Sequence, residues 1–586
     1  MKIFMVLMNI GLFLLICAGT AGGQIKDESK KMVKIFLDKR QDINRLDGMD
    51  LDFASRAIGD HAVVYAADTE LHEIIKLGFK TEIVAASNAA TAIDSEYHRY
   101  EEVLALLDSL AAEFPHITKL DTIGTSQRYG RYIQAIKISD NPEIEEDEPA
   151  VLYDGQHHAR EPVGMECCLA VLDFLLHNYG KDQQVTNWVD STEIWIVPML
   201  NPDGWVYMTE SGLADVSWRK NQRDNNSNGL FDADYDGVDL NRNYDFHWNE
   251  GGNVNPRSSR YRGPEPFSES EIRGKRDLAH AQKFVLSLTY HSRGEYLIYP
   301  WELDGKTAPD QSLIIEIADS VASRIPTLDR SGYYGFYDGN GNGGYSDVWM
   351  YGTQGTIEYT VETAPVSIPS GQDALTIAQD NVYGALYLLD RVKGPGITGH
   401  ITNAETGQPL SAVIKILEIY SPVLTPRTSD AGYGRYFRLL QPGTYTVEVS
   451  KKNYNTVTLQ NIHVSDGKLT RLDFQLDSSA VSIAENAGSG SAVLNSFKLL
   501  QNYPNPFNPK TVISYQLPAF SNVDLSIYNL QGKKVAALVN KRQAPGSYKI
   551  IWDGKDESGR EVSSGNYFCR ITAFGVTQTR KMVLIR

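Results

Sequence analysis

The feature that most constrains the fold is an alternation of apolar, strand-like segments with helical stretches, which runs from Tyr97 to about Val392. Such an alternation is typical of a parallel or mixed sheet whose connections cross it as helices. We therefore expect one large α/β domain, with a mixed, mostly parallel sheet flanked by helices. Four apolar segments have the composition of core strands: residues 149–154, 193–198, 284–290 and 356–361.

The residues before this domain divide into a leader and a small module. Lys2, an apolar run over residues 3–17 and the small residues after it form the pattern of a signal peptide, which we place at residues 1–24. Residues 25–92 combine alternating apolar patterns with one helical stretch that ends before Gly78, so an α+β module is expected. Its position predicts a propeptide, and an accessory subdomain is the alternative.

The sequence after the α/β domain, which we place at residues 93–393, changes to short strands and turns without a helical period. This pattern predicts two small all-β sandwich domains, at residues 394–477 and 496–586. A linker rich in Ser, Ala and Gly joins them over residues 478–495.

Charge and cysteine content exclude several kinds of partner and site. The net charge of −17 argues against a nucleic-acid partner, because such binding relies on clustered Lys and Arg. No segment after the leader predicts a stable membrane span. Cys167 and Cys168 are adjacent and Cys569 is distant, so neither a disulfide framework nor a Cys-based zinc site is indicated.

Three residues that follow predicted strands carry side chains that bind zinc. His158 and Glu161 are three residues apart, so both side chains could face one ion from the first turn of a helix. His291 follows the strand at residues 284–290. Because sites in α/β sheets collect beyond the carboxyl ends of strands, these residues predict a catalytic zinc site with one position left for water. Each motif alone would more often be a polar cluster at a strand end.

Glu362 ends the strand that begins near Thr356 and is the candidate general base. Peptide hydrolysis needs a group that takes a proton from water and returns it to the leaving amine, and a carboxylate beside the metal can do both. Glu358 would point to the same face of the strand but deeper in the sheet, so it is the less favoured base.

Arginines cluster in two further segments, residues 218–223 and 237–243. An enzyme that removes C-terminal residues must hold a free carboxylate, and arginine does so best through a two-pronged hydrogen-bonded pair. A single arginine would more often be a solvated loop residue, and the clustering is what favours substrate binding.

Taken together, these motifs resemble, in their order and spacing, the metallocarboxypeptidase family of carboxypeptidase A, or peptidase family M14. The resemblance covers about residues 97–392 and implies a secreted zinc exopeptidase that acts on peptides or proteins with a free C-terminus. It implies specific residue roles: His158, Glu161 and His291 bind Zn²⁺, Glu362 is the base, Asn241 and Arg242 hold the terminal carboxylate, and Arg160 and Arg219 line the cleft. Tyr337 best matches the mobile tyrosine of the family, with Tyr333 and Tyr334 as alternatives.

One departure from the family concerns the arginine that polarises the substrate carbonyl. Gln222 stands at its usual place and Arg223 follows, so either Arg223 takes the role or Gln222 and zinc share it. Such a donor contributes about 3–4 kcal/mol to transition-state stabilisation. Two further positions bear on substrate preference. Ser346 matches the floor of the specificity pocket, and Glu302 lies near a pocket position where some basic-specific relatives carry an acid. The resemblance thus implies a preference for C-terminal Lys or Arg, and a merely exposed Glu302 is the alternative.

The loop between the arginine motifs has oxygen-bearing side chains at alternate positions, over residues 224–229 and 232–237. This pattern resembles calcium loops, although the full pattern of such loops is missing. A Ca²⁺ site is therefore one interpretation of the segment from Asp224 to Asp236, and a polar, turn-rich insertion is the other.

The two all-β domains resemble modules that accompany secreted relatives. The first is similar to the transthyretin-like, or carboxypeptidase regulatory-like, domain. The second is similar to the C-terminal sorting domain of type IX secretion, which implies secretion machinery as a partner and a secreted or cell-surface location. A peptidase acting on cell-wall peptides, or an inactive surface binding protein on the same scaffold, are the alternative functions.

Overall fold

The computed structural model describes most of the chain, in which two compact units are distinguished, residues 1–480 and 481–586. The described residues are 31–46, 49, 51–58, 61–83, 93–210, 216–301, 307–339, 343–478, 497–502, 504–517, 521–543, 546–574 and 576–585. The expected signal peptide, nearly all of the expected linker and Glu302 lie outside them.

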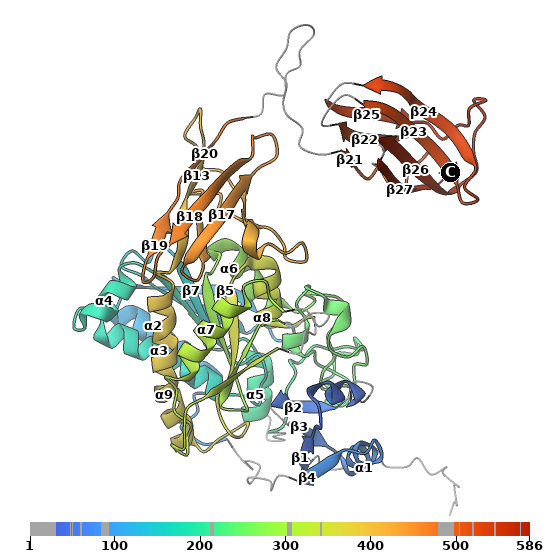
Figure 1. Ribbon diagram of the computed structural model, residues 1–586. Coiled ribbons are helices and arrows are strands. Elements are labelled where there is room, and N and C mark those ends of the chain that lie inside the picture. Colours follow the sequence, from blue (N-terminus) through green and yellow to red (C-terminus); the bar gives the residue numbers. More distant parts are fainter. Residues whose placement is uncertain are drawn as a thin grey trace, which may run out of the picture. The chain divides into compact units, whose positions relative to one another are not determined.

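An eight-stranded mixed sheet forms the centre of the first unit, in the order β11-β10-β12-β9-β7-β8-β6-β5 (Figure 1). Its pairs β7–β8, β7–β9, β9–β12 and β10–β11 are parallel, and the other neighbours are antiparallel. The strands are β5 (Thr118–Thr125), β6 (Tyr132–Ile138), β7 (Ala150–Gly155), β8 (Glu193–Val197), β9 (Leu286–His291), β10 (Tyr296–Tyr299), β11 (Gly335–Asp338) and β12 (Ile357–Glu362). The predicted α/β class with a mixed sheet is confirmed.

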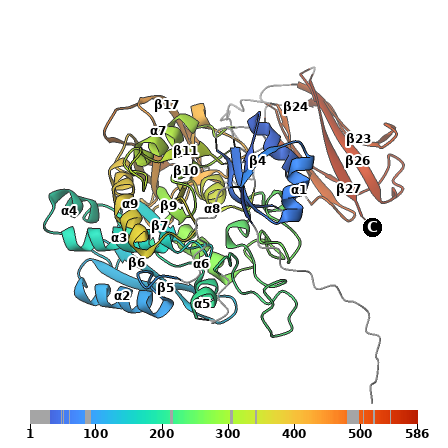
Figure 2. The ribbon, with the colours of Figure 1, turned by 90° about the horizontal axis from the view of Figure 1, so that it is seen from below.

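Two hydrophobic cores cover the two faces of this sheet, because successive side chains of a strand point to opposite faces. In β7, Val151 and Tyr153 enter one core, and Ala150 and Leu152 enter the other. Figure 2 shows α3 and α9 side by side. The helices are α2 (Tyr100–Glu113), α3 (Val163–Asn178), α4 (Gln183–Val189), α5 (Pro202–Glu210), α6 (Ser270–Gln282), α7 (Gln311–Ala322), α8 (Ser346–Trp349) and α9 (Gly371–Arg391), with short helical turns η2 (Leu240–Arg242), η3 (Trp248–Glu250) and η4 (Met350–Gln354).

The start of α3 lies unusually close to the ends of two strands. A Cβ atom on Gly164 would lie 2.6 Å from the carbonyl oxygen of Tyr290, and one on Gly155 would lie 2.7 Å from the carbonyl oxygen of Gly164. Only glycine permits these approaches. They bring the β7–α3 connection against the end of β9.

The N-terminal module is a four-stranded antiparallel sheet with one α-helix, in the order β2-β3-β1-β4. Val33, Ile35, Val64 and Ile74 form part of its core. The elements are β1 (Lys31–Phe36), η1 (Arg40–Leu46), β2 (Asp52–Ile58), β3 (His61–Ala66), α1 (Asp68–Lys76) and β4 (Lys80–Ile83). The module has the α+β composition that the sequence predicts.

The β-sandwich that follows α9 has its own core but is joined closely to the α/β part. Leu439 enters the core of the α/β part, and Arg391 donates from Nη1 to the carbonyl oxygen of Pro395 at 2.9 Å. Its elements are β13 (Gly396–Asn403), β14 (Val413–Ile416), η5 (Leu417–Ile419), β15 (Arg427–Thr428), β16 (Arg435–Leu439), β17 (Gly443–Ser450), β18 (Val457–Val464), β19 (Leu469–Arg471) and β20 (Phe474–Leu476).

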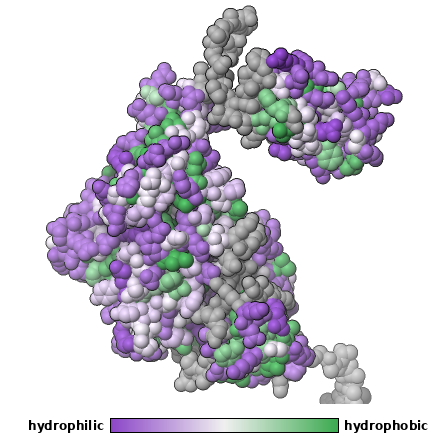
Figure 3. Space-filling model, viewed as in Figure 1, coloured by the Kyte–Doolittle hydropathy of each residue, from purple (hydrophilic) through white to green (hydrophobic). Residues whose placement is uncertain are grey.

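The second unit is all-β and packs two sheets around a separate core that contains Tyr515, Ile527 and Trp552. Its strands are β21 (Lys498–Leu499), β22 (Thr511–Leu517), β23 (Ser521–Asn529), β24 (Lys534–Gln543), β25 (Gly546–Trp552), β26 (Gly565–Ala573) and β27 (Val576–Leu584). The faces seen in Figure 3 are largely hydrophilic, with hydrophobic residues in small patches. Among the described residues, no helix has the length and apolarity needed to cross a membrane.

Candidate active site

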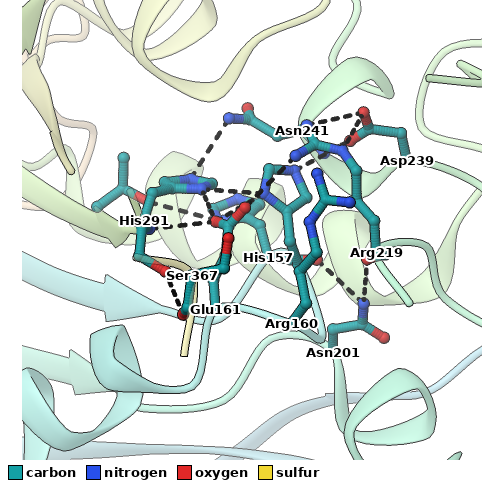
Figure 4. Close-up of polar contacts among 12 residues, drawn as sticks. His157, Arg160, Glu161, Asn201, Arg219, Asp239, Asn241, His291 and Ser367 are labelled. Carbon is teal, nitrogen blue, oxygen red and sulfur yellow. Dashed lines mark hydrogen bonds and ion pairs between the residues drawn. The ribbon is translucent and has the colours of Figure 1, made fainter. Parts of the chain in front are cut away.

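The candidate site lies where three neighbouring parallel strands end. Gly155 ends β7 and is in register with Tyr290 of β9, and His291, which ends β9, is in register with Glu362, which ends β12. The carboxyl ends of β7, β9 and β12 therefore bring residues distant in sequence to one edge of the sheet, as predicted. Figure 4 shows His291 and Glu161 converging beside Arg160 and Arg219.

His158 and Glu161 lie in a tight turn between β7 and α3. The amide of Glu161 donates to the carbonyl oxygen of His158 at 3.1 Å, and α3 begins only at Val163. The expectation that both residues occupy the first turn of the helix is therefore wrong. The close approach of Gly164 to β9 sets where the helix begins, and a turn closes the gap from Gly155.

The three predicted metal ligands converge on one point. Nδ1 of His158 and Nδ1 of His291 each lie 2.8 Å from Oε2 of Glu161, and the two nitrogens are 3.1 Å apart. All three side chains are buried. Two imidazoles and a carboxylate are a donor set that zinc accepts in catalytic sites. The three ligand atoms lie within 4.8 Å of one another, so the residues fit a single ion.

Asp239 orients His158 from behind. Its Oδ1 lies 3.1 Å from Nε2 of His158, and its Oδ2 accepts from Nε of Arg219 at 3.0 Å. Burial raises the pKa of Asp239, but Arg219, Arg242 and His158 outweigh burial and hold this pKa well below its usual range. Asp239 is thus an ionised partner for the outer nitrogen of a metal-binding histidine, a typical arrangement around zinc.

Charges also hold Glu161 in its ionised form. Burial raises the pKa of Glu161, but the opposite effect of His158 and His291 is larger and holds this pKa well below its usual range. Arg219 adds a hydrogen bond from Nη1 to Oε1 at 3.4 Å. The side chain of Glu161 is therefore ionised at neutral pH, and the ionised form is the one that binds a metal cation.

His157 is a neighbour of the site with a structural role. Its ring stacks on that of His291, and its Nε2 lies 2.8 Å from the hydroxyl of Tyr244. Burial and the nearby charge of Lys275 hold its pKa well below its usual range, so the ring is neutral. The side chain amide of Asn201 supports the turn by donating to the carbonyl oxygen of His157 at 3.0 Å.

Glu362 is half-buried beside the ligands, and its Oε2 is shielded from solvent without a hydrogen-bond partner among the described residues. Burial and the charge of Glu161 raise the pKa of Glu362 well above its usual range, although Arg219, Arg293 and Arg160 act in the opposite direction. A carboxylate with a raised pKa is suited to accept a proton and give it back.

Asn241 and Arg242 lie next to the ligand cluster. Nδ2 of Asn241 is 3.4 Å from Nε2 of His291, and its Oδ1 accepts from the amide of Ser346 at 2.8 Å. Arg242 is 8% exposed, and its Cζ lies 3.8 Å from the ring centroid of Tyr345. The structure thus brings both predicted carboxylate-binding residues to the site.

The remaining arginines separate into two groups. Nη1 of Arg160 donates to the carbonyl oxygen of Ser217 at 3.3 Å, and Arg219 contacts Glu161, so both lie at the site. Arg223 instead forms an ion pair with Glu269, with Nη1 and Oε1 2.9 Å apart. Of the two candidates for polarising the carbonyl, Gln222 is buried and Arg223 is held by another partner.

The three tyrosines considered for the mobile residue differ in their surroundings. Tyr337 lies in the edge strand β11 and packs its ring against Tyr296, whose register partner is Glu362. Tyr334 is buried and donates from its hydroxyl to the carbonyl oxygen of Thr363, so it belongs to the core. Tyr333 is 64% exposed.

A buried ion cluster that the sequence did not suggest lies under Ser346. Nζ of Lys275 contacts the carboxylates of Asp154 at 2.7 Å and Glu358 at 3.0 Å, and donates to the hydroxyl of Ser346 at 2.7 Å. Glu358 is therefore occupied in the interior and is not placed as a base. The only signal for Lys275 was its position on the apolar face of α6, with Ile272 and Leu278.

The carboxylates of the loop considered for Ca²⁺ serve its own backbone. Asp224 accepts from the amide of Gly229 at 2.7 Å, and Asp236 accepts from the amides of Asn225 and Asp232 at 2.9 Å each. These contacts are typical of Asx turns. They support the polar, turn-rich insertion and give the Ca²⁺ interpretation no support.

Three family models match the chain. The model described as zinc carboxypeptidase matches residues 103–384, the carboxypeptidase regulatory-like domain matches residues 396–477, and the FlgD Ig-like domain matches residues 508–575. The last match supports an all-β domain over these residues, and the expected likeness to a type IX sorting domain stays a prediction.

Known proteins and a solved structure agree with the first match. Carboxypeptidase B of Astacus astacus is 30% identical over 46% of this chain and 86% of its own length, and zinc carboxypeptidase A 1 of Anopheles gambiae is 31% identical over 56% and 76%. Carboxypeptidase D of Homo sapiens is 28% identical over 69% of this chain, which spans only 28% of that longer protein. The crystal structure of carboxypeptidase A from Helicoverpa armigera shares the fold, with a TM-score of 0.52 and 20% sequence identity. The match covers 62% of this chain and 97% of that one.

Proposed function

The chain belongs to the zinc carboxypeptidase family and is a hydrolase, and from this premise we propose that it removes single residues from the C-terminus of peptides or proteins, with Glu362 as the general base. The observation that carries the proposal is the convergence of His158, Glu161 and His291 beside Glu362 and Asn241 at one edge of the sheet.

His158, Glu161 and His291 would hold Zn²⁺. Zinc, when bound, supplies a Lewis acid that polarises the substrate carbonyl and makes water a better nucleophile. Asp239 keeps the outer nitrogen of His158 hydrogen-bonded, which fixes the direction in which Nδ1 of that ring points.

Glu362 takes a proton from the attacking water and delivers it to the nitrogen of the leaving residue. A raised pKa makes the ionised carboxylate a stronger proton acceptor, because the strength of a general base rises with its pKa. Oε2 of Glu362 has no competing hydrogen-bond partner among the described residues.

Asn241 and Arg242 would bind the terminal carboxylate of the substrate, and Arg160 and Arg219 would line the cleft. Arg242 stacks on Tyr345 and donates to the carbonyl oxygen of Asn241 at 2.6 Å, so its guanidinium is already oriented. An oriented guanidinium binds a carboxylate with less loss of side-chain entropy. Tyr337 would close over the substrate from β11.

Gln222 rather than Arg223 would assist in polarising the substrate carbonyl. The ion pair with Glu269 holds the guanidinium of Arg223, and breaking it would leave a fully buried carboxylate without its cation. An amide donor at position 222 is neutral, so it stabilises a developing oxyanion less than an arginine would.

A panel of N-blocked peptides tests the proposal. The full chain should release one C-terminal residue from peptides with a free carboxylate, release nothing from the matching C-terminal amides, and stop in the presence of a zinc chelator. Peptides ending in Lys, Arg, Phe, Leu and Glu would show the side-chain preference. Absence of release from a zinc-loaded sample would contradict the proposal and favour cell-wall peptides or a binding role.

The proposal extends to export of the chain. The leader pattern at residues 1–24 and the separate C-terminal unit support a secreted or surface-bound enzyme, with the last domain addressing secretion machinery. In cells that express the full chain, activity should accumulate outside the cytoplasm, and deletion of residues 496–586 should retain it inside. Equal export of both forms would contradict the role of the last domain.

A further inference from the structure

The interface between the α/β part and the β-sandwich of residues 396–476 encloses a cavity of about 70 Å³. One water molecule needs about 10–15 Å³ of such space, so the cavity has room for a small polyatomic ion or several waters. The amino ends of three parallel strands line it through Ala150, Val285 and Ile357. β12 leads from Ile357 to Glu362, a distance of about 17 Å at about 3.3 Å per residue. The cavity therefore lies at the opposite end of the sheet from the candidate active site.

Two arginines of the sandwich, Arg427 and Arg438, line this cavity. Among the described residues, neither guanidinium has a carboxylate within 4.0 Å, and both Nη1 of Arg427 and Nε of Arg438 are buried without a hydrogen-bond acceptor. Burial, together with the charge of Arg438, lowers the pKa of Arg427 to about 10. Two half-buried cations in one cavity repel each other unless an anion compensates them.

The position of Arg427 is fixed by the α/β part. A Cβ atom on Gly355 would lie 2.5 Å from Cδ of Arg427, and Cζ of Arg427 lies 5.2 Å from the ring centroid of Tyr351. The glycine leaves the space that the arginine occupies, and the aromatic ring supports the guanidinium. The arrangement is thus built from both domains.

Three acidic side chains also line the cavity, and none lies within 4.0 Å of the Arg427 or Arg438 guanidinium among the described residues. Asp310 accepts from the hydroxyl of Tyr351, and its charge also acts on Arg427. Asp430 accepts from the amide of Tyr433 at 2.7 Å through Oδ1, and its Oδ2 lies 4.0 Å from Nε of Arg435. Burial, with the charge of Glu146 next, raises the pKa of Glu148 to about 8, so this carboxyl is largely protonated at neutral pH.

A third cation adds to the positive character of the cavity. Nζ of Lys283 donates to the hydroxyl of Thr428 at 3.0 Å and to the carbonyl oxygen of Ser429 at 3.3 Å, and no described carboxylate pairs with it. Burial lowers the pKa of this lysine, and the nearby charge of Asp430 acts in the opposite direction. Lys283 comes from the α/β part and the two arginines from the sandwich, so an anion here would contact both domains.

We propose that this cavity binds a small oxyanion of the phosphate or sulfate class, held by Arg427 and Arg438 and joining the sandwich to the α/β part. Guanidinium groups recognise such ions through paired N–H donors. Binding to the folded interface alone would stabilise the two domains as one body.

Calorimetric titration of inorganic phosphate into the full chain, at fixed ionic strength, tests the proposal. Phosphate should bind saturably at one such site, and Arg427→Gln and Arg438→Gln should each weaken that binding at least tenfold. The matched control is Arg471→Gln, because Arg471 is exposed in the same domain and pairs with Asp473. Parallel titrations with sulfate and acetate separate a tetrahedral oxyanion from any carboxylate. Binding that survives both cavity variants, or no binding of phosphate or sulfate, would overturn the assignment.

Hydrogen exchange on the unaltered chain gives a measurement that does not depend on how the variants fold. Phosphate should slow amide exchange in residues 350–357 and 427–439, which line the cavity from its two sides. Slowing confined to residues near His158 and Arg242 would show that phosphate binds only at the active site and would overturn the proposal.

Discussion

Asp239 contacts both a predicted metal ligand and the arginines beside the ligands. It contacts Nε2 of His158 at 3.1 Å, and its side chain lies 3.9 Å from Nε of Arg242. It also pairs with Arg219, which reaches Glu161. One buried carboxylate therefore orients a metal ligand and forms ion pairs with two arginines.

The substitution Asp239→Asn should weaken zinc binding by about 10- to 100-fold, because outer partners of metal-binding histidines contribute to affinity on this scale. Competition with a chromogenic chelator measures the change. Asp236→Asn is the control, since Asp236 is equally buried but contacts only loop amides. Equal zinc affinity in the Asp239 variant and the unaltered chain would contradict the role given to Asp239.

Arg242→Lys keeps the charge and removes the fork that matches a carboxylate. We expect kcat/KM for a peptide with a free C-terminus to fall about 10- to 100-fold, as charge-assisted hydrogen bonds contribute about 1.5–3 kcal/mol. The melting temperature and the zinc content should change little. A fall in melting temperature that accompanies the loss of activity would instead assign Arg242 a structural role.

Substitutions of Gln222 and Arg223 should show which of these adjacent residues polarises the substrate carbonyl. Gln222→Ala should lower kcat by about tenfold or more with little change in KM, since such a donor acts mainly in the transition state. Arg223→Ala should leave kcat largely unchanged and lower the melting temperature, because it leaves Glu269 without its cation. The reverse pattern would assign the role to Arg223.

At the residue scale, the sequence allowed the ligands and neighbouring arginines to be proposed, because their order and spacing follow the strand ends. It could not show Lys275 beneath Ser346 or the pairing of Arg223 with Glu269. These contacts join residues far apart along the chain, and an ion pair of this kind leaves no periodic pattern.

At the scale of elements, helix α6 contains a carboxyl group whose protonation should change stability. Glu271 is fully buried, and burial together with the charge of Glu269 raises its pKa to about 8. A carboxyl whose pKa is raised on folding stabilises the folded state in acid, and this contribution is lost as pH rises from about 4.5 towards 8.

Glu271→Gln should therefore make the free energy of unfolding less sensitive to pH between about 5 and 9. Relative to the unaltered chain, the variant should gain stability as pH rises, by up to about 1.4 kcal/mol for each pKa unit of the shift. Urea unfolding at several pH values measures this. The control is Glu113→Gln, at an exposed position of α2, whose free energy of unfolding should depend on pH in the same way as that of the unaltered chain. If Glu271→Gln shows this same pH dependence, the pKa of Glu271 is not raised.

The sequence pattern predicted the buried strands of the sheet better than the start of helix α3. The apolar runs predicted β7, β8, β9 and β12, because a strand buried on both faces is apolar throughout. The start of α3 was placed too early. Helix propensity does not reveal that Gly155 and Gly164 bring the helix against β9 and leave a turn before Val163.

At the scale of the whole molecule, the domains differ in how much they depend on one another. The sandwich that follows α9 places Leu439 in the core of the α/β part and accepts a hydrogen bond from Arg391 through the carbonyl oxygen of Pro395. Residues 481–586 form a separate compact unit with its own core. Changes in the sequence pattern predicted the α/β domain and the two all-β domains. They could not show which of these domains share a core.

Two truncations test this difference. A chain ending at residue 480 should keep the kcat/KM and the melting temperature of the peptidase. A chain ending at residue 392 should melt at least about 4 °C lower, because it exposes apolar surface of the α/β core, and a loss of 1 kcal/mol lowers the melting temperature of a large domain by about 2–4 °C. Calorimetry measures both, and equal melting of the two chains would contradict a shared core.

The most direct test of the central claim compares the unaltered chain with Glu362→Gln in zinc content and in hydrolysis of one N-blocked peptide. Both proteins should hold one zinc per chain, since Glu362 is not among the three converging ligands. The variant should lose at least about 10²-fold in kcat, because general acid–base catalysis contributes about 10²–10⁴-fold. A variant that keeps its zinc and its full rate would contradict the account, as would an unaltered chain that holds zinc and releases no C-terminal residue.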